Sequence, residues 1–120
     1  TNTSSGATIL FSGALTTPTL TTAAQGYNLQ LLGTSGTITN NVSFTNTGSL
    51  GLGASGGTQT YSAGLTATAP SSVTLAGTII LGASATFGDS DTAVSLGAAT
   101  TVNSSAVNTA INFGGAISSI

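Results

Sequence analysis

Two carboxylates, Asp89 and Asp91 in "FGDSD" (87–91), are the only acidic side chains in the 120-residue sequence. Carboxylates spaced this closely could act as an acid–base pair. They could also bind calcium together with backbone carbonyls, although calcium takes about 6–8 oxygen ligands, several of them usually anionic. Gly and Ser surround both residues, so we expect a solvated corner loop. Asp89 and Asp91 remain a weak calcium candidate, and we expect no other metal or cofactor site.

The rest of the composition excludes most other chemistry. Lys, Arg, His, Glu and Cys are all absent. Seventeen serines therefore have no imidazole or lysine to activate them as nucleophiles. Without a cation to neutralise phosphate, nucleic-acid binding is not expected, and without cysteine no disulfide can form. We predict a protein that is not an enzyme and has no catalytic residues.

Hydroxyl and amide groups must supply almost the whole polar surface. Thr, Ser, Gly and Asn account for 66 of the 120 residues, and only 2% of residues are charged. Val, Ile, Leu and Phe still provide 28 residues, a fraction just above the roughly 20% below which chains tend to stay disordered. We therefore expect one folded β-rich domain over residues 1–120 with a slender core.

Alternation of apolar and polar residues is the main structural signal. In 72–82, Val73, Leu75, Ile79 and Leu81 fall on one parity, which predicts one face in the core and one in solvent. The same period of two marks short strands in YNLQL (27–31), NVSFT (41–45), AVSLG (93–97) and AINFG (110–114).

The connections between these strands favour a coil over a set of hairpins. Neither Asn-Gly nor Asp-Gly occurs, although two-residue hairpin loops prefer those pairs. The sequence predicts an all-β fold, a parallel β-solenoid of about five or six short coils with roughly 20 residues each. The alternative is a pilin-like β-sandwich that donates its first strand (6–15) to a neighbour. Strand direction separates the two, because the sandwich has mainly antiparallel strands.

Six aromatic residues lie at positions 11, 27, 44, 61, 87 and 113, and the first four of them are almost evenly spaced. Each of the early intervals could be one turn of a coil, which would stack the rings in an internal ladder. The alternative is that six strands each happen to carry one ring. The predicted core residues are Phe11, Tyr27, Phe44, Tyr61, Leu75, Phe87 and Phe113.

The two ends of the sequence repeat one phrase. "ILFSGAL" (9–15) matches "INFGGAI" (111–117) at an offset of 102. We expect slightly more than one unit of a longer tandem repeat, or subunits that add end to end. The predicted polymerisation strands carry Ile9, Phe11, Ile111, Phe113 and Ile117.

A family resemblance rests on three segments: "NVSFTNTGSLGLG" (41–53), "GGTQTYSAGLTATAPSSVTLAGTI" (56–79) and "VNTAINFGGAI" (107–117). They resemble repeats of large secreted bacterial proteins, the filamentous-haemagglutinin-like adhesins and autotransporter passengers. The resemblance implies an exported right-handed parallel β-helix used for adhesion or surface structure. We therefore expect an extracellular or cell-surface structural protein whose main partner is itself, as a homopolymer or a tandem repeat.

Three further expectations concern partners. Thr-x-Thr recurs, for example at 37–39 and 58–60, and flat ranks of this motif resemble the ice-binding face of some antifreeze proteins. Asn2, Asn41 and Asn103 lie in N-x-[ST] sequons, so glycans are a candidate partner. The longest aliphatic run covers only 79–81, so no membrane-spanning helix is expected.

Overall fold

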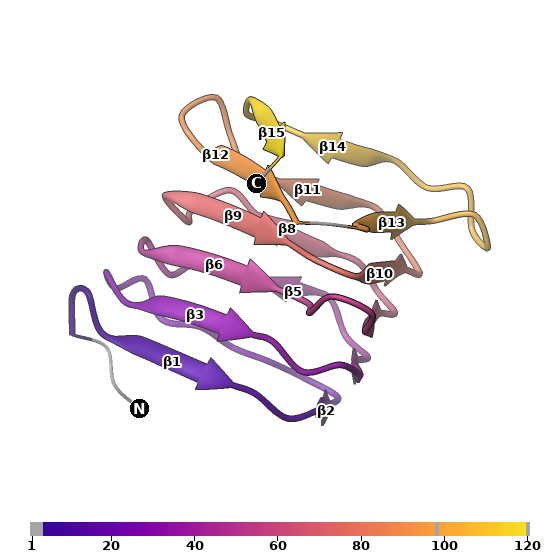
Figure 1. Cartoon of the computed structure of the whole chain (residues 1–120), viewed down its shortest axis with the longest axis horizontal. Helices are drawn as coiled ribbons and strands as arrows, with labels where there is room; N and C mark the ends of the chain where they lie inside the picture. Colours follow the sequence, from indigo (N-terminus) through magenta and orange to yellow (C-terminus); the bar gives the residue numbers. More distant parts are fainter. Residues whose placement is uncertain (1–3, 98, 120) are drawn as a thin grey trace.

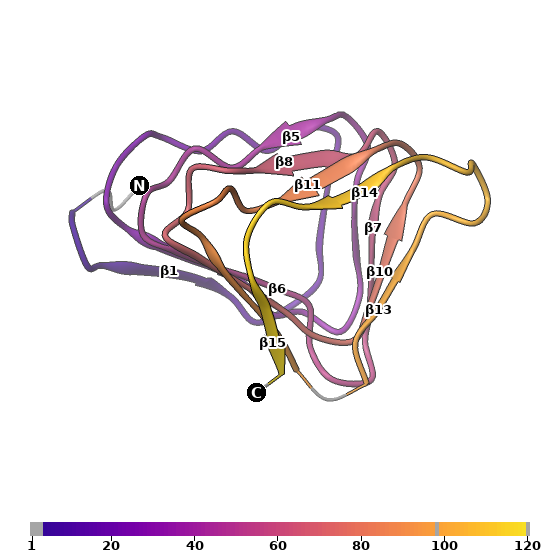
Figure 2. The ribbon, with the colours of Figure 1, turned by 90° about the horizontal axis from the view of Figure 1, so that it is seen from above.

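The chain is a three-sided parallel β-solenoid of about five turns. A computed structural model describes residues 4–97 and 99–119. Four of the described turns each contribute one strand to each of three sheets, whereas the first described turn contributes a strand to two of them only. The turns stack along one axis (Figure 1) around a triangular outline (Figure 2). All strand pairings between the described residues are parallel. This arrangement confirms the predicted β-solenoid.

The three sheets, called A, B and C, differ in their number of strands. Sheet A holds β1 (Thr8–Phe11), β3 (Asn28–Leu31), β6 (Ser49–Leu52), β9 (Ser72–Leu75), β12 (Ala93–Leu96) and β15 (Ile117–Ser119). Sheet B holds β2 (Leu15–Thr17), β4 (Gly36–Ile38), β7 (Thr58–Tyr61), β10 (Thr78–Leu81) and β13 (Thr101–Asn103). Sheet C holds β5 (Val42–Ser43), β8 (Leu65–Ala67), β11 (Ala85–Phe87) and β14 (Ile111–Phe113).

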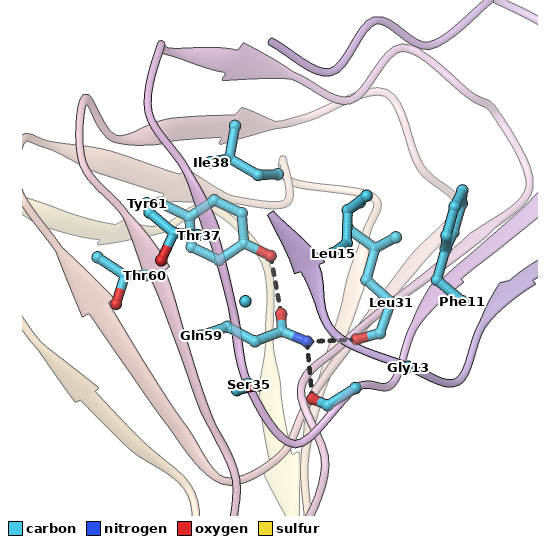
Figure 3. A pocket seen from close by; sticks show the side chains of 12 residues that line it. Phe11, Gly13, Leu15, Leu31, Ser35, Thr37, Ile38, Gln59, Thr60 and Tyr61 are labelled. Carbon is cyan, nitrogen blue, oxygen red and sulfur yellow. Dashed lines mark hydrogen bonds between the residues drawn. The ribbon is translucent and has the colours of Figure 1, made fainter. Parts of the chain in front are cut away.

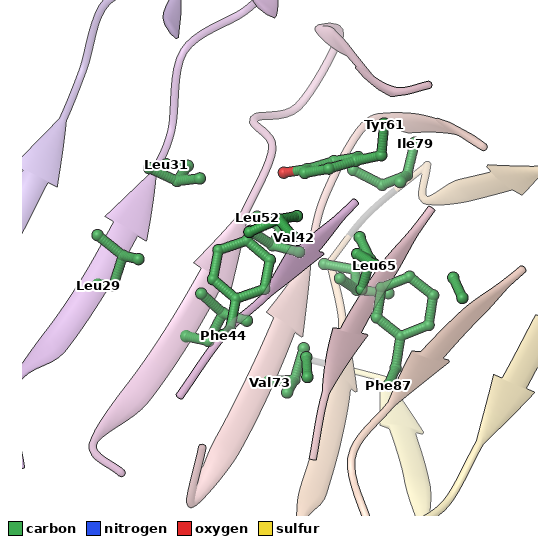
Figure 4. Packing of buried hydrophobic residues seen from close by; sticks show 14 of the residues in the cluster. Leu29, Leu31, Val42, Phe44, Leu52, Tyr61, Leu65, Val73, Ile79 and Phe87 are labelled. Carbon is green, nitrogen blue, oxygen red and sulfur yellow. The ribbon is translucent and has the colours of Figure 1, made fainter. Parts of the chain in front are cut away.

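Residues in register form columns that run the length of the stack. Because side chains alternate along a strand, every second column points into the core. One inward column of sheet A consists of Ile9, Leu29, Leu50, Val73, Val94 and Ile117. The next consists of Phe11, Leu31, Leu52, Leu75, Leu96 and Ser119. The slender core therefore consists of stacked columns of aliphatic side chains, together with aromatic rings such as Phe44, Tyr61 and Phe87 (Figure 4).

Corners of small residues turn the chain from one sheet to the next. The run 72–82 is not one strand, because Ala76 and Gly77 separate β9 in sheet A from β10 in sheet B. Gly77 has a φ of +69°, and a Cβ there would collide with the carbonyl oxygen of Ala54 one turn below. Only glycine adopts this conformation readily and leaves room for that backbone. The alternation predicted the buried residues but not the corner.

The continuous aromatic ladder is wrong. One turn leads from Thr8 to its partner Asn28, and a longer turn leads from Ala85 to Ile111. The early aromatic residues follow one another more closely than this, so successive rings lie at different positions around the turn. Among the described residues, one aromatic pair stacks: Phe87 and Phe113, with ring centroids 5.4 Å apart and an interplanar angle of 23°.

The donated-strand sandwich is also wrong for this chain, because β1 pairs in parallel with its own β3. The two terminal phrases do not occupy equivalent positions in the solenoid. Ile9 lies in sheet A but Ile111 lies in sheet C, so the offset between the two phrases is not a whole number of turns. Five whole turns lead instead from Ile9 to Ile117, in the same column of sheet A.

In the described part of the chain, no helix is both long and apolar enough to cross a membrane.

Candidate functional site

The carboxylate of Asp89 is used within its own loop, between β11 and β12. Its Oδ1 accepts hydrogen bonds from the backbone N–H of Asp91 (3.0 Å) and from the hydroxyl of Thr92 (2.8 Å). The Thr92 hydroxyl bond, followed by the Asp91 backbone bond, lowers the pKa of Asp89. A general acid needs the opposite shift. Among the residues that the structure describes, no cluster of three or more His, Cys, Asp or Glu side chains could hold a metal ion.

The loop itself is held from two sides. The Thr92 hydroxyl is buried and also lies 3.2 Å from the carbonyl oxygen of Pro70, one turn below. Gly114 and Gly115 pack against the backbone of this loop from the turn above, so closely that no Cβ would fit. The geometry therefore assigns Asp89 a capping role in a corner, while Asp91 is exposed beside it.

A buried polar cluster lies inside the solenoid, where the sequence offered no candidate. Gln59 is 6% exposed, and its Nε2 donates to the carbonyl oxygens of Leu31 (2.7 Å) and Gly33 (3.2 Å) (Figure 3). Its Oε1 accepts a hydrogen bond from the Tyr61 hydroxyl at 3.0 Å. Burial raises the pKa of the Tyr61 phenol well above its usual value. The cluster ties β7 to the corner between β3 and β4, and every polar group in it has a partner.

Gly36 lies beside this cluster, and a Cβ on it would collide with the backbone of Leu15 one turn below. The pairing of Thr37 with Thr60 places Gly36 one turn below Gln59 in the same inward column. A small cavity of about 10 Å³ is lined among others by Phe11, Gly36 and Tyr61. This volume is close to the minimum that holds one water molecule. The cavity is therefore too small for an organic ligand.

The predicted core residues occupy three environments. Those buried to 2% exposure or less are Tyr27, Phe44, Tyr61, Leu75 and Phe87. Phe113 is partly buried and packs against the core. Phe11 is 36% exposed, although it shares an inward column with Leu31. Its exposure follows from position, because β1 is the outermost described strand of sheet A and no turn covers its other side.

The residues predicted for polymerisation lie on the two outermost turns. Ile9 and Phe11 belong to β1 at one end of the stack. At the other end, Ile111 and Phe113 belong to β14 and Ile117 to β15. Ile117 is 49% exposed, whereas Val94, its neighbour in the same column, is fully buried. Both ends of the described stack therefore present apolar side chains at inward positions.

Threonine columns on the outside of sheet B form the remaining candidate surface. One outward column contains Thr16, Thr37 and Thr60, and the other contains Thr58, Thr78 and Thr101. The motif at 1–3 lies outside the described residues. Of the others, 19–21 and 45–47 lie between strands and 66–68 begins in β8 of sheet C, so they do not contribute to this rank. Threonines one full turn apart would have been the correct signal, but the turn length was not visible in the sequence.

Protein-family models, curated proteins and solved structures were all compared with the chain, and none of them matched it.

Proposed function

We propose that this chain is a structural, non-enzymatic unit of an extracellular filament or surface adhesin. Successive units add end to end through the edges of their β-sheets. One observation carries the proposal: the apolar columns of the core are open at both described ends, at Phe11 (36% exposed) and at Ile117 (49% exposed). One further turn at each end would bury these two side chains and would pair the free backbone groups of the edge strands.

The composition supports a mechanical role outside the cell. The chain has no Lys or Arg, and so it offers no cleavage site to trypsin-like proteases. Natural β-proteins commonly protect exposed edges with Lys or inward-pointing charges. Here neither β1 nor β15 carries a charge. The resemblance to secreted bacterial adhesin repeats agrees with this role and with a cell-surface location.

Sedimentation velocity across a concentration series, with electron microscopy of the same samples, tests the proposal. We expect the weight-average mass to rise with concentration and unbranched particles to lengthen along one axis. The matched variants Phe11→Ser and Ser12→Thr separate end-to-end addition from lateral association. Phe11→Ser should weaken assembly and Ser12→Thr should not. A monodisperse particle of 11.4 kDa at all concentrations would refute the proposal.

Ice binding is the second candidate, and the threonine rank of sheet B favours it. Strands in a sheet lie about 4.8 Å apart, and alternate residues along a parallel strand lie about 6.6 Å apart. The outward threonines therefore form a regular array of hydroxyl and methyl groups without any charge. Ile80 and Asn103 continue the Thr60 column, so the array is not uniform.

Thermal hysteresis measures ice binding directly. Thr78→Tyr replaces the central member of one threonine column with a bulky ring and should abolish any hysteresis. The matched variant Thr86→Tyr places the same ring on the outside of sheet C and should leave hysteresis unchanged. No hysteresis in the unmodified chain would refute ice binding and would leave the filament proposal intact.

A further inference from the structure

We propose that Asn103 is an acceptor for an N-linked sugar and that it can be modified after the chain has folded. Neither the filament nor ice binding is needed for this modification. Of the three N-x-[ST] sequons, the one at Asn2 lies outside the described residues, which leaves Asn41 and Asn103 to compare. The fold places these two sequons in opposite situations, because one belongs to a sheet and the other opens a loop.

Asn103 ends β13, and its side chain lies on the outward side of sheet B. Its register partner Ile80 continues the outward column of Thr60, whereas Val102, the residue before it, packs against the core. Residues 105–108 are exposed and belong to the connection that projects beyond the triangular outline (Figure 2). A sugar on Asn103 would therefore extend sideways from the stack into solvent.

The acceptor amide and the hydroxyl-bearing residue of this sequon are already held together. Asn103 Oδ1 accepts a hydrogen bond of 2.8 Å from the backbone N–H of Ser105, which closes an Asx turn. Among the residues that the structure describes, none accepts a hydrogen bond from the Asn103 Nδ2, the nitrogen to which an N-linked sugar is attached. Ser105 is exposed, so a transferase can reach both residues of the sequon.

The loop can also open without disturbing the solenoid. The backbone N–H groups of Val107 and Asn108 both donate to the carbonyl oxygen of Ser104. The Ser104 hydroxyl donates to the carbonyl oxygen of Thr109 at 3.0 Å. All of these bonds stay within the connection 104–110. Breaking them leaves β13 paired with β10 and β14 paired with β11, so opening the loop costs little free energy compared with global unfolding.

The sequon at Asn41 is instead held within a sheet. Asn41 Nδ2 donates to the carbonyl oxygen of Ala63 in the turn above, at 3.0 Å. Val42, the middle residue of the sequon, is 1% exposed and begins β5, which pairs with β8. To enter the active site of a transferase, this segment would have to leave sheet C and withdraw Val42 from the core. Asn41 is therefore an acceptor only before folding.

Attachment is a group transfer, catalysed by a separate glycosyltransferase with a sugar diphosphate ester as donor. The Asn103 Nδ2 forms a bond to the anomeric carbon of the sugar. The bond from that carbon to the diphosphate oxygen breaks, and the diphosphate ester leaves with the electron pair. One amide proton passes to a base of the transferase. The sugar hydroxyls would add hydration to a chain that carries only two charged side chains.

Incubation of the folded chain with a sequon-specific N-glycosyltransferase and nucleotide-diphosphate glucose measures each site as an acceptor. Asn2→Gln removes the third sequon from every sample. Linear peptides covering 36–48 and 99–110 give the rate of each unfolded sequon, at an enzyme concentration that modifies both peptides completely. Intact mass counts the sugars, and peptic peptides locate them. We expect Asn103 to react within about tenfold of its peptide, and Asn41 about 100-fold or more slowly than its peptide.

Three further variants connect the reaction to the two sequons. Ser105→Ala removes the sequon hydroxyl and should abolish modification of Asn103, whereas Ser104→Ala keeps the sequon and should leave Asn103 modified. Ser43→Ala removes the sequon of Asn41 and should not change the sugar content of the folded chain. The proposal is overturned if folding suppresses Asn103 as strongly as Asn41. It is equally overturned if both sites of the folded chain react as fast as their peptides.

Discussion

Replacing Gln59 with Leu should expose how much the buried polar cluster contributes to folding. The substitution keeps a side chain of similar size but removes an amide that serves three partners. Leu31 O retains a hydrogen bond from the Gly53 N–H at 2.9 Å. The Gly33 carbonyl and the Tyr61 hydroxyl lose the bond from Gln59. Each buried polar group left unpaired costs about 1–3 kcal/mol, so Gln59→Leu should lower the free energy of unfolding by about 2–6 kcal/mol.

The effect of a second substitution, Tyr61→Phe, on the free energy of unfolding should have opposite signs in the wild-type and Gln59→Leu backgrounds. In the wild-type chain it leaves Gln59 Oε1 without a donor and should destabilise by about 1–3 kcal/mol. In the Gln59→Leu background it removes a phenol that has already lost its partner. There it should restore about 1–3 kcal/mol, because only the Gly33 carbonyl then remains unpaired.

Urea unfolding followed by far-UV circular dichroism measures these differences, provided the slope of the transition stays constant across the variants. A constant slope is a necessary control, because stacked repeats can lose cooperativity. Thr60→Val changes the outward residue between Gln59 and Tyr61 and should stay within about 0.5 kcal/mol of wild type. The reasoning is refuted if Tyr61→Phe destabilises the Gln59→Leu background as much as it destabilises the wild-type chain.

Three further predictions concern pH, packing and the corners. The lowered pKa of Asp89 contributes stability that is lost as pH falls below about 4, and the raised pKa of Tyr61 makes unfolding easier above about pH 10. The melting temperature should therefore be nearly constant between about pH 5 and 9, and a shift of many degrees there would contradict the assignment of titrating groups. Phe44→Ala should cost about 3–5 kcal/mol in urea unfolding, and a cost below about 1 kcal/mol would show that the ring is not packed as described. Gly77→Ala should cost at least about 1–3 kcal/mol while Gly13→Ala, which has open space around it, should be nearly neutral; equal effects would refute the role of the corner.

The alternation of apolar and polar residues predicted which side chains are buried, but it did not predict where the chain turns from one sheet to the next. The reason is geometric. Val73, Leu75, Ile79 and Leu81 are all fully buried, as their shared parity indicates. Two of them lie in sheet A and two in sheet B. The corner between the strands consists of Ala76 and Gly77, and an even number of residues preserves parity. A straight strand and a bent pair of strands therefore give the same pattern in the sequence.

The polar cluster was harder to predict because its partners are distant in the sequence. Gln59 shares parity with Tyr61, so alternation alone places its side chain inside. Its acceptors, Leu31 and Gly33, precede it by 28 and 26 residues. Only the turn length brings them together, and turn length depends on how many residues each corner contains. The spacing of the early aromatic residues suggested a shorter turn than the hydrogen-bonded registers show.

This variation in turn length has a consequence for how such a chain can diverge or be engineered. The connection between β13 and β14 spans 104–110 and projects beyond the triangular outline (Figure 2), with Val107 43% exposed. The equivalent connection one turn below, between β10 and β11, spans only 82–84. Phe87 and Phe113 nevertheless remain in register across this difference. Corners therefore absorb insertions locally, and a foreign peptide grafted between residues 104 and 110 would be displayed outside a scaffold whose strand pairing is unchanged.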